Sequence, residues 1–171
     1  AAATVARRIA AVKSFFAHLV ARGVIPADPA KKLAAPKIKK VAPKALAPDE
    51  IERLLAAPGR SGNAKSLRDR ALLELLYATG MRVSEITHLR LDDVDWEAGE
   101  ITCPGRGDRQ RRLPLGSAAE ALAEYLHRGR PKLVRETSPA TLFLNQRGQR
   151  LTRQGIWIIL REAATAAGLS D

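Results

Sequence analysis

The chain has 171 residues, of which 46% are hydrophobic and 27% are charged, and its formal net charge is +11. This length is enough for one domain, or for one domain with part of another, and a single cysteine excludes an internal disulfide. No apolar run approaches the roughly 20 residues that span a bilayer, and the first residues lack the features of a signal peptide, so we expect a cytoplasmic protein that binds no membrane.

The positive charge is concentrated in the first quarter of the chain. Residues 1–47 contain ten lysines and arginines and one acid, whereas residues 48–171 contain nineteen lysines and arginines and seventeen acids. This excess favours a polyanionic partner such as nucleic acid. A solvated basic face is the alternative interpretation of the same charges.

The first predicted element is an amphipathic helix. Apolar residues recur at helical spacing over residues 4–22. Arg7, Arg8 and Lys13 lie off that apolar stripe and are candidates for contact with nucleic acid.

A linker is predicted next. Residues 34–48 combine three prolines with four lysines, among them Lys39 and Lys40, and contain no acid. Because proline restrains its neighbours from helix, this segment predicts an extended chain, and we place a domain boundary near residue 46. Lys39 and Lys40 are further candidates for contact with a phosphate backbone.

Beyond the linker, the sequence predicts a mainly helical architecture with a small three-stranded antiparallel sheet at one side. Helical periodicity and capping residues, with Ser66, Thr152 and Gly80 among them, predict helices over residues 48–58, 66–80, 82–89, 117–128 and 152–168. Strand-like pieces separated by glycine-containing turns predict the sheet between residues 92 and 116, and a further short strand is expected over 142–145.

The first candidate for chemistry is Arg82. It follows the helix stop at Gly80 and begins a new helix, and Glu85 stands one turn further on, where its carboxylate can hold the guanidinium. A planar guanidinium held in this way is suited to bidentate contact with a phosphate. The alternative is an ordinary intrahelical ion pair.

The second candidate is a predicted basic hairpin. It carries Arg106, Arg109, Arg111 and Arg112 against one acid, Asp108, and glycines flank Arg106 at the turn. Such a tip is open enough to approach a nucleic-acid backbone or groove, and a charged strand edge exposed to solvent is the alternative.

The third candidate is the start of the last predicted helix. Thr152, Arg153 and Gln154 occupy its N-terminus, where backbone amides favour an oxyanion and the side chains can reach a phosphate or a base edge. Trp157 and Ile158 are expected to belong to the core.

No metal site and no cofactor are predicted. Cys103 has no Cys or His neighbour at metal-ligand spacing, and His18, His88 and His127 each stand alone. The sequence also lacks a GxGxxG motif, a Walker loop and a Ser/His/Asp set.

In this order, the three candidates resemble the tyrosine site-specific recombinases, most closely the Xer-type bacterial enzymes. "LLYATGMRVSEITHLRLDDVD" is similar to the segment that carries the family's first catalytic arginine, which falls on Arg82. "ITCPGRGDRQRRLPLG" resembles the family's active-site hairpin, and "LFLNQRGQRLTRQGIWIIL" resembles the stretch that leads to the second half of the active site. Residues 7–55 are similar to the last helix of the family's core-binding domain and the linker after it.

The resemblance implies the domain organisation. Residues 1–35 would be the C-terminal part of a helical core-binding domain, 36–46 the linker, and 47–171 the N-terminal part of a catalytic domain with the tyrosine-recombinase fold. The two domains of the family clamp duplex DNA, and the parent would act as a tetramer with further recombinase subunits on that DNA.

The resemblance also implies the reaction. A tyrosine attacks the scissile phosphate, a 3′-phosphotyrosyl intermediate forms without metal or ATP, and arginines such as Arg82 stabilise the transition state. The role would be DNA integration and recombination, with chromosome-dimer resolution in chromosome segregation and mobile-element integration both open.

Two departures from the family pattern matter. The hairpin position that usually carries the lysine acid is Arg106, and a guanidinium is a poor proton donor at neutral pH. The chain also stops where the family's His-x-x-Arg segment and tyrosine nucleophile would begin, and neither Tyr77 nor Tyr125, both expected to be packed in helices, fits that motif. We therefore expect a fragment that is inactive alone, whose parent is an enzyme, with a non-catalytic DNA-binding protein on the same scaffold as the alternative.

Overall fold

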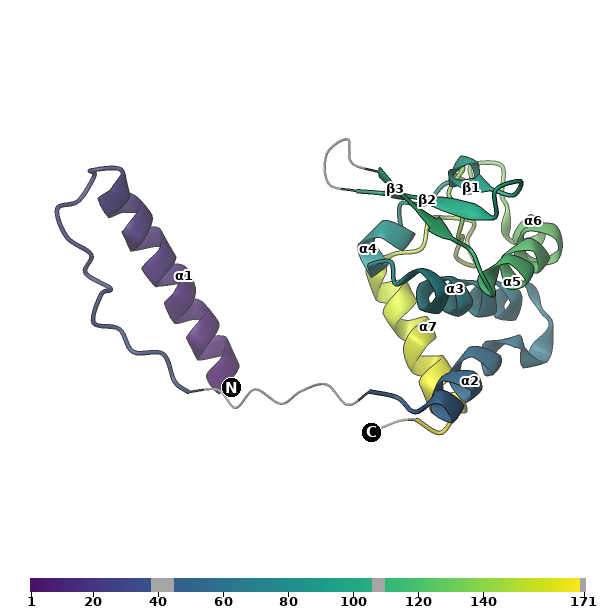
Figure 1. Ribbon diagram of the computed structural model, residues 1–171, viewed down its shortest axis with the longest axis horizontal. Helices are drawn as coiled ribbons and strands as arrows, with labels where there is room; N and C mark the ends of the chain where they lie inside the picture. The colour runs from purple at the N-terminus through teal and green to yellow at the C-terminus, as the bar shows by residue number, and fades with distance from the viewer. Residues whose placement is uncertain (38–44, 106–109, 170–171) are drawn as a thin grey trace. The chain divides into compact units, whose positions relative to one another are not determined.

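The structure is a computed structural model that describes residues 1–37, 45–105 and 110–169 (Figure 1). The chain divides into two compact units, Ala1–Ala45 and Leu46–Asp171. Within the described residues, no helix is both long enough and apolar enough to cross a membrane.

The described residues of the first unit form one helix, followed by a turn and an irregular segment. Helix α1 spans Ala2–Ala21, which confirms the predicted helix, and none of its residues is buried. Ile9, Phe16 and Leu19 are half-buried, whereas Phe15 is 58% exposed. The helix therefore has an amphipathic pattern, and its apolar side is only partly covered within this unit.

The second unit contains all the other elements. Its helices are α2 (Pro48–Ala56), η1 (Pro58–Ser61), α3 (Ala64–Thr79), α4 (Val83–Ile86), η2 (Leu91–Asp93), α5 (Ala118–Glu124), η3 (Tyr125–Gly129), α6 (Arg130–Leu133) and α7 (Arg153–Ala166). Its strands are β1 (Val94–Asp95), β2 (Glu100–Pro104) and β3 (Gln110–Pro114). This confirms the expected mainly helical architecture with a small sheet.

Helix α3 forms the centre of the second unit and packs against α5 and η3. It begins one turn before the predicted cap, because the side chain of Asn63, not Ser66, caps it: Asn63 Oδ1 accepts a hydrogen bond from the Ser66 backbone N–H at 2.9 Å. The helix ends as predicted at Gly80, whose φ of 60° lies in the left-handed region that glycine adopts without strain.

The sheet is antiparallel in the order β1-β2-β3. Val94 pairs with Ile101, and Cys103 pairs with Arg111. Ile101 and Cys103 are fully buried, whereas Thr102 between them is half-buried, so β2 covers the core with alternate side chains.

Two predicted elements differ in the structure. The strand expected over 142–145 is not formed: the segment makes isolated bridges, and the Leu144 N–H donates to the hydroxyl of Tyr125 at 3.2 Å while the Leu144 carbonyl accepts from Arg68. Side chains, not a neighbouring strand, satisfy these backbone groups. The α-helix expected over 117–128 is α-helical only as far as Glu124, where α5 ends. The chain continues from there as a turn of π-helix, η3.

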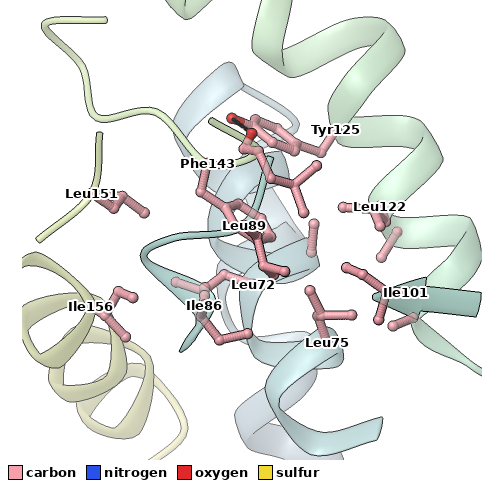
Figure 2. Close-up of a cluster of buried hydrophobic side chains, with 14 of the residues drawn as sticks. Leu72, Leu75, Ile86, Leu89, Ile101, Leu122, Tyr125, Phe143, Leu151 and Ile156 are labelled. Carbon is pink, nitrogen blue, oxygen red and sulfur yellow. Dashed lines mark hydrogen bonds between the residues drawn. The ribbon is translucent and has the colours of Figure 1, made fainter. Parts of the chain in front are cut away.

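Figure 2 shows the core that holds these elements together. Leu72 and Leu75 of α3, Ile101 of β2 and Leu122 of α5 all belong to this core, and all four are fully buried. The ring of Tyr125 stacks on Phe143, with 5.5 Å between the ring centroids. This packing fixes the C-terminal end of α3, from which the candidate site begins.

Candidate functional site

The backbone around Arg82 is held by packing on both sides. The chain leaves α3 at Gly80, buries the side chain of Met81, and begins α4 with Arg82 at its N-cap. The Arg82 backbone N–H donates a hydrogen bond to Glu85 Oε2 at 2.7 Å. Arg82 therefore has a fixed backbone at a point where two helices meet.

Glu85 is the central acid of this site. Arg111 of β3 makes a two-point contact with its carboxylate, from Nη1 to Oε1 at 3.0 Å and from Nη2 to Oε2 at 2.8 Å. Arg82 Nη1 donates to Oε1 at 3.1 Å. The hydrogen bonds from Arg111, and then those from Arg82, lower the pKa of Glu85 from 4.5 to about 2, although burial acts in the opposite direction.

Arg111 and Arg82 differ in how many of their guanidinium nitrogens are bound to Glu85. The guanidinium of Arg111 is bound through both terminal nitrogens and its side chain is 41% exposed. Arg82 contacts Glu85 through one terminal nitrogen and is 77% exposed, and its other guanidinium nitrogens have no protein partner among the residues that the structure describes. Arg82 thus keeps donors free for a ligand.

These side chains line an open hollow of about 730 Å³. Its lining residues come from α4 with its N-cap, the turn after it, the end of β2 with the residue that follows, and β3: they are Arg82, Ser84, Glu85, His88, Pro104, Gly105 and Arg111. Two guanidinium groups face one carboxylate here, so the described part of the hollow has an excess of positive charge that suits an anion.

The predicted hairpin is described only in part. Arg106 and Arg109 lie outside the described residues. Arg112 is exposed on β3, 3.8 Å from the carboxylate of Glu100, and Arg111 is engaged by Glu85. The proposed DNA contacts of the hairpin arginines remain predictions.

The start of α7 is capped as predicted, since the Thr152 hydroxyl oxygen accepts a hydrogen bond from the Gly155 N–H at 3.0 Å. Arg153 and Gln154 are exposed and line a second hollow, of about 440 Å³, together with Trp157. The contact of these residues with DNA stays a prediction.

The expectation that Trp157 and Ile158 belong to the core was wrong. Their exposed fractions are 58% and 43%. Ile156, Ile159 and Ala163 are the buried residues of α7, and this three- to four-residue spacing turns the intervening side chains outward. The guanidinium of Arg161 lies over the ring of Trp157, 5.4 Å from its centroid.

The structure describes three of the candidate cations of the first unit. Arg7 and Arg8 of α1 are exposed and Lys13 is half-buried, whereas Lys39 and Lys40 lie outside the described residues. Their role in DNA binding remains a prediction.

The two tyrosines lie in different environments. Tyr125 is fully buried and its hydroxyl accepts from the Leu144 N–H, and burial raises the pKa of its phenol. Tyr77 is 59% exposed, so the prediction that it is packed was wrong.

A second charged network, which sequence reasoning missed, connects α3 to α7. Arg68 and Asp69 are buried and paired, with 2.7 Å from Arg68 Nε to Asp69 Oδ1, and Lys65 Nζ lies 2.7 Å from Glu162 Oε2. Burial raises the pKa of Asp69 against the opposing effect of Arg68 and Lys65. Arg68 also donates to the Leu144 carbonyl, so these charges are satisfied within the fold.

His88 was also missed as a member of the hollow. The sequence signal was available, because positions 82, 85 and 88 recur at a spacing of three in the helix predicted over 82–89.

Comparisons with known proteins identify the family. Residues 44–171 match the model of the phage integrase family. The tyrosine recombinase XerC of Roseiflexus castenholzii is 51% identical over 174 residues, covering 100% of this chain and 55% of the relative. The tyrosine recombinase XerD of Listeria innocua is 43% identical over 168 residues, covering 97% of this chain and 56% of the relative. The chain therefore spans about half the length of these curated relatives.

Solved structures agree with this result. The XerA recombinase superimposes with a TM-score of 0.65 at 27% identity, over 77% of this chain and 46% of its own. A lambda integrase dimer bound to a COC′ core site gives 0.68 at 22% identity, over 99% and 60% of the two chains, and supports the fold alone. The chain belongs to the phage integrase family, and its relatives there are the Xer-type tyrosine recombinases.

Proposed function

We propose that this chain is part of a site-specific tyrosine recombinase and that the hollow around Arg82 holds the scissile phosphate of duplex DNA. The observation that carries this proposal is the state of Arg82: its backbone is fixed by the Glu85 carboxylate, while its guanidinium is 77% exposed in a hollow with excess positive charge. A planar donor with free N–H groups matches the oxygens of a phosphodiester.

In the proposed reaction, a tyrosine oxygen attacks the scissile phosphorus and the bond to the 5′ oxygen breaks, which leaves a 3′-phosphotyrosyl link. Negative charge grows on the phosphate oxygens in the transition state, and a donor that is already oriented stabilises it without reorganisation. Glu85 serves as the positioning residue, because it fixes the Arg82 backbone and holds Arg111 across the hollow. No described tyrosine is in a position to serve as nucleophile in this hollow, since its lining contains neither Tyr77 nor Tyr125.

The proposal includes the partners and the organisation of the whole protein. The relatives of known structure include a lambda integrase tetramer bound to a Holliday junction and an XerH recombinase bound to its difH substrate. By analogy, the parent of this chain would bind duplex DNA as an assembly of subunits, with the first unit as part of a core-binding domain and the second as part of the catalytic domain. The basic residues of α1, the hairpin and the start of α7 would follow the phosphate backbone.

The experiment uses the full-length parent with Arg82→Lys. Lysine keeps the charge but loses the planar fork, so we expect single-turnover cleavage of a nicked suicide duplex to fall by about 10²–10³-fold while DNA affinity changes by a few fold. Arg128→Lys is the matched control, because Arg128 also makes an ion pair on its own helix, at 2.7 Å from Glu124. It should leave cleavage unchanged.

The outcome separates the proposal from its alternatives. If Arg82→Lys cleaves the duplex at a rate within a few fold of the unmodified protein, Arg82 is only a structural ion-pair partner of Glu85. A parent that binds DNA but cleaves no substrate would favour the non-catalytic DNA-binding protein, for which the arginine at position 106 in place of the usual lysine is the supporting feature.

A further inference from the structure

His88 lies in the hollow with Arg82 but has no part in the function proposed above. It follows α4 by two residues, its side chain is exposed, and it lines the hollow together with Arg82, Glu85 and Arg111. These three are the other charged groups that line the hollow within the described chain, from α4 and its N-cap and from β3.

The ring of His88 is oriented by Ser84 of α4 and by Thr87, which follows that helix. Its Nδ1 lies 2.7 Å from the carbonyl oxygen of Ser84 and 3.2 Å from the hydroxyl of Thr87. A carbonyl oxygen only accepts, so Nδ1 carries the proton in the neutral ring as well as in the charged ring. Nε2 is consequently the nitrogen whose protonation changes, and no described protein group is hydrogen-bonded to it.

The charges in the hollow determine how this ring responds to an anion. Arg82 and Arg111 carry the positive charges that line the hollow, and the single carboxylate of Glu85 is hydrogen-bonded to both. A bound phosphodiester adds negative charge beside the ring and favours its protonated form. By linkage, a group that is more protonated in the complex makes binding stronger at lower pH.

We propose that His88 is a third cationic ligand of the phosphodiester in this hollow, and that its Nε2 takes up a proton when DNA binds. This inference rests on the proposed function, since it requires DNA in the hollow. The Nε2–H of the protonated ring then donates to a phosphate oxygen, next to the free donors of Arg82. The contact is oriented by Ser84, so His88 adds a directed hydrogen bond and not only charge.

The test is isothermal titration calorimetry of the 171-residue chain with a short duplex, between pH 6 and 8, in pairs of buffers with different ionisation enthalpies. The observed heat then reports the number of protons taken up per duplex bound. We expect uptake of up to one proton, and an affinity that falls by up to about tenfold per pH unit over the range in which the ring titrates. His88→Gln should abolish the uptake and flatten the pH dependence.

The chain contains three histidines, so matched controls exist. His18→Gln and His127→Gln should keep the uptake of the unmodified chain. Uptake that persists in His88→Gln, or that disappears in a control variant, would overturn the proposal. NMR titration of the His88 ring, assigned by its loss in His88→Gln, gives a second readout: its apparent pKa should be higher with DNA than without it, and an equal value would also overturn the proposal.

The experiment distinguishes this inference from the proposed function. Binding of DNA that depends on Arg82 but involves no proton uptake at any pH would remove only the role of His88. An absence of DNA binding at low salt over the whole pH range would contradict the proposed function itself.

Discussion

Replacement of Glu85 by glutamine tests the arrangement of the candidate site most directly. Glutamine keeps the shape of the side chain and one accepting oxygen, but it removes the charge that both Arg111 and Arg82 contact. We expect two opposite effects: a less stable fold and stronger binding of DNA.

The loss of stability follows from the pKa of Glu85. A pKa that falls from 4.5 to about 2 on folding corresponds to about 3 kcal/mol of stabilisation at neutral pH. Arg111 and Arg82 are 41% and 77% exposed, and solvent screening of such partners reduces this value to about 1–2 kcal/mol. Glu124→Gln, which removes the charge that pairs with Arg128 at 2.7 Å and with Arg70 at 3.6 Å, should cost less, about 0.5–1 kcal/mol.

The pH dependence has a defined direction. Since folding lowers the pKa of this carboxyl, its contribution is complete above the unfolded-state value of 4.5 and is lost as the pH falls toward about 2. Urea unfolding of the unmodified chain and of Glu85→Gln at several pH values measures the difference between their free energies of unfolding. We expect a constant difference in the free energy of unfolding above about pH 5 and a shrinking difference below pH 4.5, because the other carboxyls are common to both proteins.

The effect on DNA binding is measured with the same proteins. Without the carboxylate, the hollow gains one net positive charge, so the slope of log affinity against log salt should become steeper by up to about 1. Equal stability of the two proteins at pH 7, or a difference that is unchanged at pH 3, would refute the assigned role of the Glu85 carboxylate. Weaker DNA binding by Glu85→Gln at low salt would contradict the expected effect of the added positive charge.

Three further outcomes are expected. Because the basic segment before residue 48 releases counterions on binding, the affinity of the 171-residue chain for duplex DNA should fall steeply between 50 and 200 mM salt in a gel-shift titration, about tenfold or more; a flat response would argue against phosphate contacts. Incubation of this chain with a suicide duplex should give no covalent adduct on a denaturing gel, since Tyr125 is buried and Tyr77 does not line the hollow; an adduct lost on mutating either tyrosine would contradict this. Tyr125→Phe should lower the free energy of unfolding by about 1–3 kcal/mol in urea denaturation, because the buried N–H of Leu144 loses its acceptor; a change below about 0.5 kcal/mol would mean that this hydrogen bond is replaced.

Local chemistry in the sequence was enough to predict most of the elements around the site. The stop at Gly80, the new helix at Arg82 and the contact with Glu85 involve residues within five positions of one another, and each depends on backbone sterics or on the spacing of one helical turn. The same is true of the cap at Thr152, whose partner is three residues away. The sheet was predictable because glycine turns and strand-forming pieces alternate over a short range.

The sequence predicted less well where several local arrangements were equally compatible with it. Asn63 and Ser66 are both good capping residues, and only the packed start of α3 selects Asn63. The apolar run at 142–145 has the composition of a strand, but the hydroxyl of Tyr125 and the guanidinium of Arg68 take the backbone groups of Leu144. On α7, the direction of the core decides which apolar residues face it, and this leaves Trp157 outside.

Only the tertiary structure decided which charged side chains meet. Arg111 reaches Glu85 from 26 positions away, because the register that pairs Cys103 with Arg111 brings this part of β3 to the edge of α4. That contact engages both terminal nitrogens of Arg111, whereas Arg82 contacts Glu85 through one terminal nitrogen only. The sequence does not show this difference, because both residues are arginines in basic surroundings. The physical reason is that caps, turns and helical spacing act within a few residues, whereas the pairing of distant charges depends on strand register and on the packing of the core between them.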